Sequence, residues 1–65
     1  MRRKDEDWIV EEWNVADRDI ARVLAVCSRR SVADEMFDLW AASSPKLWII
    51  LRRADRVVRE HIAQG

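Results

Sequence analysis

Glycine is almost absent from this chain of 65 residues, whose single glycine is the last residue, Gly65. Average usage of about 7% would place roughly four or five glycines in a chain of this length. Only one proline, Pro45, interrupts the rest of the sequence. Because glycine and proline are the strongest local interruptions of regular structure, the sequence predicts long regular elements joined by tight, glycine-free connections.

Apolar residues in the first half of the chain recur with a helical period. They stand alternately four and three residues apart, at Ile9, Trp13, Ala16, Ile20, Val23 and Cys27. This spacing places their side chains along one face of a helix. Acidic residues at 5–7 fit a helix start, where the helix dipole favours negative charge. We expect one helix over about 5–28, or two helices if it breaks near Asn14, a good N-cap residue.

Two more helices are predicted over about 31–42 and 45–63. Ser31 is the expected N-cap of the first, and Pro45 the first helical residue of the second, where its missing N–H costs nothing. The expected inner face of helix 31–42 carries Val32, Met36, Leu39 and Trp40, and that of helix 45–63 runs from Leu47 to Ile62. The predicted fold is a single all-α domain over 1–65, a three-helix bundle, or four helices if the first one breaks.

Charge and hydropathy exclude several classes of protein. Twelve basic residues balance twelve acidic ones, whereas nucleic-acid-binding proteins usually carry a basic excess. The longest apolar run, residues 47–51, is far too short to span a membrane. The basic start at residues 1–4 meets acidic residues at once, unlike a secretory signal. We expect a cytoplasmic or recombinantly expressed protein with no nucleic-acid or membrane partner; because zero net charge does not oppose self-association, a homodimer is a candidate.

The residues best suited to chemistry are Cys27 and His61, the only cysteine and the only histidine. One cysteine cannot form an internal disulfide, and one cysteine with one histidine falls short of a four-ligand zinc site. Cys27 lies on the apolar stripe, so we expect it in the core, and His61 follows the apolar face of the last predicted helix. The sequence therefore predicts no catalytic, metal or cofactor site, and no enzyme.

Five large apolar residues lie off the predicted helical stripes or at their edges: Trp8, Val10, Phe37, Trp48 and Ile49. The chain also has four tryptophans, a high number for its length. Such residues either cover the ends of the bundle or form an exposed patch that binds a partner or a second copy. These five residues are the candidate association patch.

The stretch from Asp19 to Val32 resembles the helix-turn-helix motif of bacterial transcription regulators. It has Ile20-Ala21, then Leu24 three residues after the alanine, and a polar turn before the next predicted helix. The resemblance implies a second helix that reads DNA in the major groove. It carries no base-contacting role over to any residue, since the next segment holds carboxylates at Asp34, Glu35 and Asp38.

The chain as a whole resembles a computationally designed or redesigned helical bundle. Sparse glycine, balanced charge, helical patterning and short capped connections are typical of such proteins. This resemblance implies a protein with no biochemical function beyond folding, and that is the leading functional expectation. The alternatives are a small helical protein–protein interaction module and, third, a helix-turn-helix DNA-binding domain.

Overall fold

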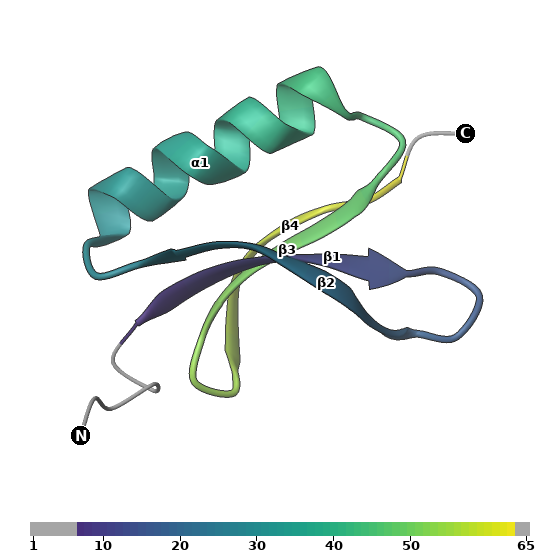
Figure 1. Ribbon diagram of the computed structural model, residues 1–65, viewed down its shortest axis with the longest axis horizontal. Coiled ribbons are helices and arrows are strands. Elements are labelled where there is room, and N and C mark those ends of the chain that lie inside the picture. Colours follow the sequence, from purple (N-terminus) through teal and green to yellow (C-terminus); the bar gives the residue numbers. More distant parts are fainter. Residues whose placement is uncertain (1–6, 64–65) are drawn as a thin grey trace.

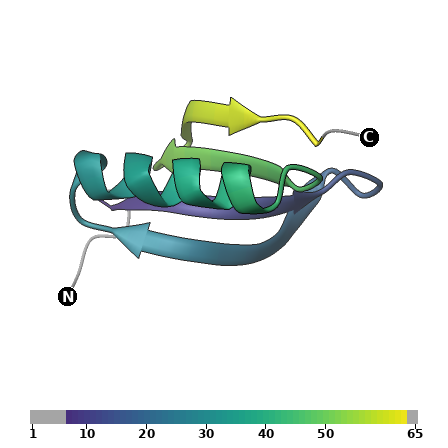
Figure 2. The same ribbon diagram turned by 90° about the horizontal axis from the view of Figure 1, so that it is seen from above.

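The computed structural model of the protein describes residues 7–63, which form a four-stranded antiparallel sheet with one helix on one face (Figure 1). Along the chain the elements are β1 (Trp8–Asn14), β2 (Asp19–Cys27), α1 (Arg30–Ser43), β3 (Trp48–Arg53) and β4 (Arg56–His61). The strand order in the sheet is β2-β1-β3-β4. Two hairpins therefore lie side by side, and α1 connects the outer strand of the first to the inner strand of the second (Figure 2).

The predicted all-α bundle is wrong. Within residues 7–63, the expected helices over 5–28 and 45–63 are replaced by hairpins, and a helix is present only at Arg30–Ser43. The resemblance to a designed helical bundle fails with it. The helix-turn-helix resemblance fails as well, because its expected first helix is the strand Asp19–Cys27.

β-bulges in the edge strands explain why the apolar residues of the sequence recur with a helical period. The register between β1 and β2 shifts twice, which leaves Leu24 and Ala21 as extra residues in β2. A regular strand alternates with a period of two, and each bulge adds one residue to that period. The apolar residues Ile20, Val23 and Cys27 consequently fall three and four residues apart, as they would on a helix.

The second hairpin also has a sequence that resembles a helix, but for a different reason. Strand β3 is apolar on both faces, so Ile49, Ile50 and Leu51 form a continuous run without polar residues. In β4 the register shift opposite Leu51 and Arg52 leaves Val58 as an extra residue beside Val57. A short continuous apolar run cannot be told from a buried helix by its period alone.

Asn14 accepts hydrogen bonds from the following backbone amides, as an N-cap residue does, but it does so in a β-hairpin turn. The Asn14 side-chain carbonyl Oδ1 accepts hydrogen bonds from the amides of Ala16 and Asp17, at 2.9 and 3.2 Å. The amide of Arg18 donates to the Asn14 main-chain carbonyl at 2.7 Å and closes the loop. The chain does break at Asn14, but into a β-hairpin and not into two helices.

The turn between β3 and β4 consists of Ala54 and Asp55, and Ala54 has a φ of 55°. A left-handed backbone costs a residue with a Cβ about 1–2 kcal/mol, whereas glycine adopts it without strain. We expect Ala54→Gly to stabilise the protein by about 1 kcal/mol, which would raise its melting temperature by about 4–8 °C. In contrast, Ala21→Gly, an exposed change within β2, should lower the melting temperature; thermal melts of both variants followed by circular dichroism test this, and a lower value for Ala54→Gly would contradict it.

The helix begins one residue earlier than expected and turns a different face inward. Its N-cap is Arg29, which makes no side-chain capping hydrogen bond, and not Ser31. Ala33 and Phe37 are its buried residues, whereas the expected inner residues Val32 and Leu39 are exposed. The packing face is therefore Ala33, Met36, Phe37, Trp40 and Ala41.

The core lies between α1 and the helix-facing side of the sheet. Its buried members are Val10, Cys27, Ala33, Phe37, Ile49 and Leu51. No helix in the described part of the chain is long and apolar enough to cross a membrane.

An ion-pair clamp ties α1 to the edge strand β4. The Arg59 guanidinium donates to carboxylate oxygens of Asp38 at 2.8 Å and Asp34 at 3.3 Å, and it lies 4.4 Å from the centre of the Phe37 ring. The hydrogen bond to Asp38 is the main cause that raises the pKa of Arg59, which desolvation partly offsets. Because the pKa of Arg59 is raised in the folded state, the stabilisation from the protonated guanidinium is fully present below the ordinary pKa of arginine and is lost as the pH rises through the raised pKa. The clamp is therefore insensitive to added base across the neutral range.

Candidate functional site

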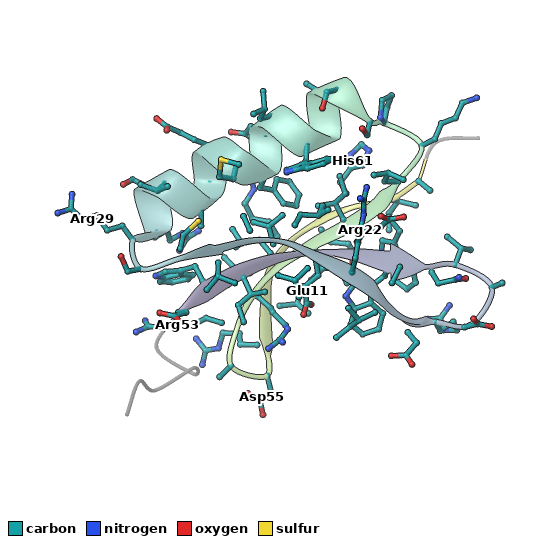
Figure 3. All side chains as sticks on the ribbon, viewed as in Figure 1. Glu11, Arg22, Arg29, Arg53, Asp55 and His61 are labelled. Carbon is teal, nitrogen blue, oxygen red and sulfur yellow. The ribbon has the colours of Figure 1, made fainter. Side chains whose placement is uncertain are left out.

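One face of the sheet has no covering element among residues 7–63. Figure 1 shows α1 on one side of the sheet only, and Figure 3 shows Glu11 on the side away from the helix. We call this surface the open face. From the strand register it consists of Ile9, Glu11 and Trp13 of β1, Ile20, Val23 and Val26 of β2, Trp48, Ile50 and Arg52 of β3, and Val57 and Glu60 of β4.

The open face is largely apolar, although it is the side on which an antiparallel sheet usually carries polar residues. Ile20, Val23 and Val26 (59% exposed) are exposed along the edge strand β2, and Val57 (55% exposed) lies on the opposite edge strand β4. Single exposed apolar side chains are ordinary, but a contiguous patch on a small protein marks an interaction site. This sheet is therefore built like one that is covered on both sides.

A buried ion pair lies within the open face. The side chain of Glu11 is fully buried (0% exposed), and its Oε1 accepts hydrogen bonds from Arg52 Nε at 2.9 Å and Trp13 Nε1 at 3.2 Å. A second guanidinium nitrogen of Arg52 donates to the carbonyl of Ala54. The other oxygen of Glu11, Oε2, is buried without a hydrogen-bond partner among the described residues. A buried acceptor left unpaired costs about 1–3 kcal/mol or more, so this centre of the face is already desolvated.

The end of the open face near the first hairpin turn is aromatic. Trp13 and Trp48 lie opposite each other on β1 and β3, with ring centroids 5.6 Å apart. Arg18 lies 5.6 Å from the centre of the Trp48 ring, and Trp48 Nε1 donates to Glu60 at 2.7 Å. Tilted aromatic pairs of this kind contribute beyond the area that they bury, and tryptophan is enriched where proteins bind one another.

The opposite end of the open face is hollow. A cavity of about 280 Å³ is lined by Asp7, Ile9, Val23, Val26 and Arg52. Two of these residues are exposed valines of the edge strand. The open face therefore has a hollow next to protruding apolar side chains, a shape that could fit a complementary surface closely.

Both edges of the sheet are poor templates for further strands. Bulges at Leu24 and Ala21 interrupt β2, and the bulge at Val58 interrupts β4. Bulges twist an edge away and blunt strand addition. The two edges are therefore poorly suited to pairing with a strand of another chain.

The structure divides the five residues of the predicted association patch. Val10, Phe37 and Ile49 are buried in the core between the sheet and α1. Trp8 packs against the same core from the helix-facing side. Only Trp48 belongs to the open face, so the predicted patch does not form one surface.

The residues considered for chemistry lie far apart in the sheet. Cys27 ends β2 and is buried in the core, whereas His61 ends β4, at the other edge. His61 Nε2 donates to the carbonyl of Pro45 at 3.0 Å, which anchors the end of β4 to the loop after α1. Among residues 7–63, no group of three or more histidine, cysteine, aspartate or glutamate side chains could hold a metal ion.

Sequence reasoning missed Glu11, Arg52 and the exposed valines as functional candidates. Glu11 and Glu12 form an acidic pair of a kind that usually faces solvent, but Glu11 is buried. A usable signal was the tract from Trp8 to Trp13, because alternation places Glu11 on the same face as Ile9 and Trp13. That signal emerges only if the tract is taken as a strand.

No protein-family model, curated protein or solved structure matches this chain.

Proposed function

We propose that this protein is a self-associating interaction module, in which the open faces of two copies pack against each other. The observation that carries the proposal is the set of exposed apolar side chains on the open face, on both sides of the buried pair of Glu11 and Arg52. Two sheets stacked in this way would lie about 10 Å apart, with the helices on the outside. Each copy would supply the layer that the other lacks.

The size of the open face suits a reversible dimer. Strands about 4.8 Å apart and about six residues long give a face of roughly 20 Å by 20 Å. Two such faces would remove on the order of 1,000 Å² from water, which is the lower range for specific interfaces. We expect a dissociation constant on the order of 10–100 μM.

Charge and chain length favour a second copy as the occupant. The chain has no net charge, so two copies do not repel each other through their overall fields. The ends of the open face carry both signs, with Asp7 at the hollow and Arg18 beside Glu60 at the aromatic end. A chain of this length buries only about 60% of the surface that its unfolded form exposes, and small domains often gain stability by oligomerising.

Sedimentation over a range of concentrations tests the proposal. The unmodified protein is expected to change from monomer to dimer near the stated dissociation constant. Val26→Lys with Val57→Lys places two cations in the open face, where burial without a partner is strongly unfavourable. We expect this double variant to weaken dimerisation by at least about a hundredfold while its circular dichroism is retained.

Leu39→Lys is the matched control, because Leu39 is equally exposed (61%) but lies on α1. It should dimerise like the unmodified protein. A protein that stays monomeric up to about 1 mM, or dimers that Leu39→Lys disrupts and the double variant does not, would contradict the proposal.

A further inference from the structure

A second surface lies on the helix-facing side of the sheet, away from the open face. A pocket of about 570 Å³ opens where the N-terminus of α1 meets the turn between β3 and β4, and Trp8 forms part of its wall. Arg30, Arg53 and Arg56 also line it. Figure 3 shows Arg53, Asp55 and Arg29 at this same end of the molecule.

The pocket concentrates positive charge around one aromatic ring. The guanidinium carbons of Arg53 and Arg30 lie 4.7 and 5.6 Å from the centre of the Trp8 ring. Arg53 also pairs directly with Arg56 across the hairpin, and like charges in directly opposed positions destabilise a sheet. The Trp8 ring thus positions the guanidinium groups of Arg30 and Arg53, and the hairpin places Arg56 next to Arg53.

Nearby carboxylates neutralise this charge only in part. Arg30 lies 3.5 Å from Asp34, an i,i+4 pair on α1. Arg53 and Arg56 make no ion pair with any residue of the described chain. Among residues 7–63, Asp55 is the one carboxylate that lines the pocket. Among the described residues, three guanidinium groups face two carboxylates, Asp34 on Arg30 and Asp55 in the pocket wall, which leaves an excess of positive charge that an anion would satisfy.

We propose that this pocket binds a phosphate group. Guanidinium groups match phosphate oxygens with paired, charge-assisted hydrogen bonds, and three of them converge here. The two cations over Trp8 occupy its ring, so the aromatic side chain positions the arginines and does not stack on the ligand. Recognition is therefore of the phosphate itself. The uncapped N-terminus of α1 adds a favourable helix dipole on the same side.

Binding is tested by titrating inorganic phosphate and, separately, a nucleoside monophosphate into the full chain at constant ionic strength held with sodium chloride. The indole N–H signal of Trp8, assigned with Trp8→Phe, reports occupancy by nuclear magnetic resonance. We expect saturable shifts with both ligands. A tighter monophosphate identifies phosphate monoesters as the source, and equal binding identifies free phosphate.

Three variants connect the response to the pocket. Arg56→Gln should weaken phosphate binding about tenfold, since a charge-assisted hydrogen bond is worth about that factor. Lys46→Gln removes one exposed positive charge at the other end of α1 and should leave binding unchanged. Asp55→Asn removes the opposing carboxylate and should strengthen binding about threefold.

Shifts that do not saturate, or that chloride alone produces, would overturn the proposal. Equal binding by Arg56→Gln and the unmodified protein would do the same. The pocket lies on the side of the sheet opposite the open face, so dimerisation by sedimentation provides a separate result.

Discussion

Replacing Arg52 by methionine is expected to destabilise the fold by about 3 kcal/mol, because it leaves the fully buried carboxylate of Glu11 without its cation. Methionine keeps most of the apolar stem that arginine packs against its neighbours. A domain of this size has a total stability of only about 3–10 kcal/mol. The substitution should therefore consume a large part of the stability, as urea unfolding at a concentration where the chain is monomeric would measure.

A double-mutant cycle separates the charge from the packing. Glu11→Leu combined with Arg52→Met replaces the whole pair by apolar side chains, which is often neutral or stabilising. We expect the double variant to be more stable than Arg52→Met alone by about 2 kcal/mol or more.

Arg22→Met provides the control on the same sheet. Arg22 pairs with Glu12 at 2.7 Å, but its side chain is 58% exposed, and exposed pairs contribute about 0–1 kcal/mol. If Arg52→Met cost no more than Arg22→Met, Glu11 would not be the buried, dependent group that the geometry indicates.

The helix could be predicted from the sequence because its signals are local. The segment after Arg29 contains no glycine or proline until Pro45, and the residues from Ala33 to Ala41 that pack against the core follow a helical period. What could not be derived was the phase of its inner face. That phase depends on the surface it packs against, which is a sheet and not a second helix.

The hairpins could not be predicted because their usual signals are missing. Tight hairpins commonly use glycine where φ is positive, but here Arg18 and Ala54 occupy those positions. Bulges also disrupt alternation in both edge strands. The apolar residues consequently match a helical period better than strand alternation, although the segments form paired strands.

The open face was hidden for a related reason. A helical period places Ile20 and Val23 on the inner face of the first predicted helix, and it selects Ile49 and Val10 as surface candidates instead. In a strand, neighbouring residues point to opposite faces, so an error in secondary structure exchanges buried and exposed positions. Trp48 is selected in either case, because a tryptophan at the edge of an apolar stripe is a candidate for association whether the segment forms a helix or a strand.

The attachment of α1 to the sheet gives the second large expected effect. Phe37 is 4% exposed and belongs to the core cluster. Deleting a buried phenyl ring costs about 3–5 kcal/mol, and a helix as short as α1 is marginal in water without tertiary contacts. We expect Phe37→Ala to lose about 3–4 kcal/mol in urea unfolding, with the helix and the sheet unfolding together.

Leu39→Ala on the same helix decides between the two folds. Leu39 is 61% exposed, so its truncation should change the stability by less than about 0.5 kcal/mol. In the three-helix bundle that the sequence pattern favours, Leu39 faces inward and Phe37 lies off the stripe. That arrangement reverses the ranking of the two variants. A larger loss for Leu39→Ala than for Phe37→Ala would therefore contradict the helix-on-sheet packing, and with it the open face and the arginine pocket that this packing positions.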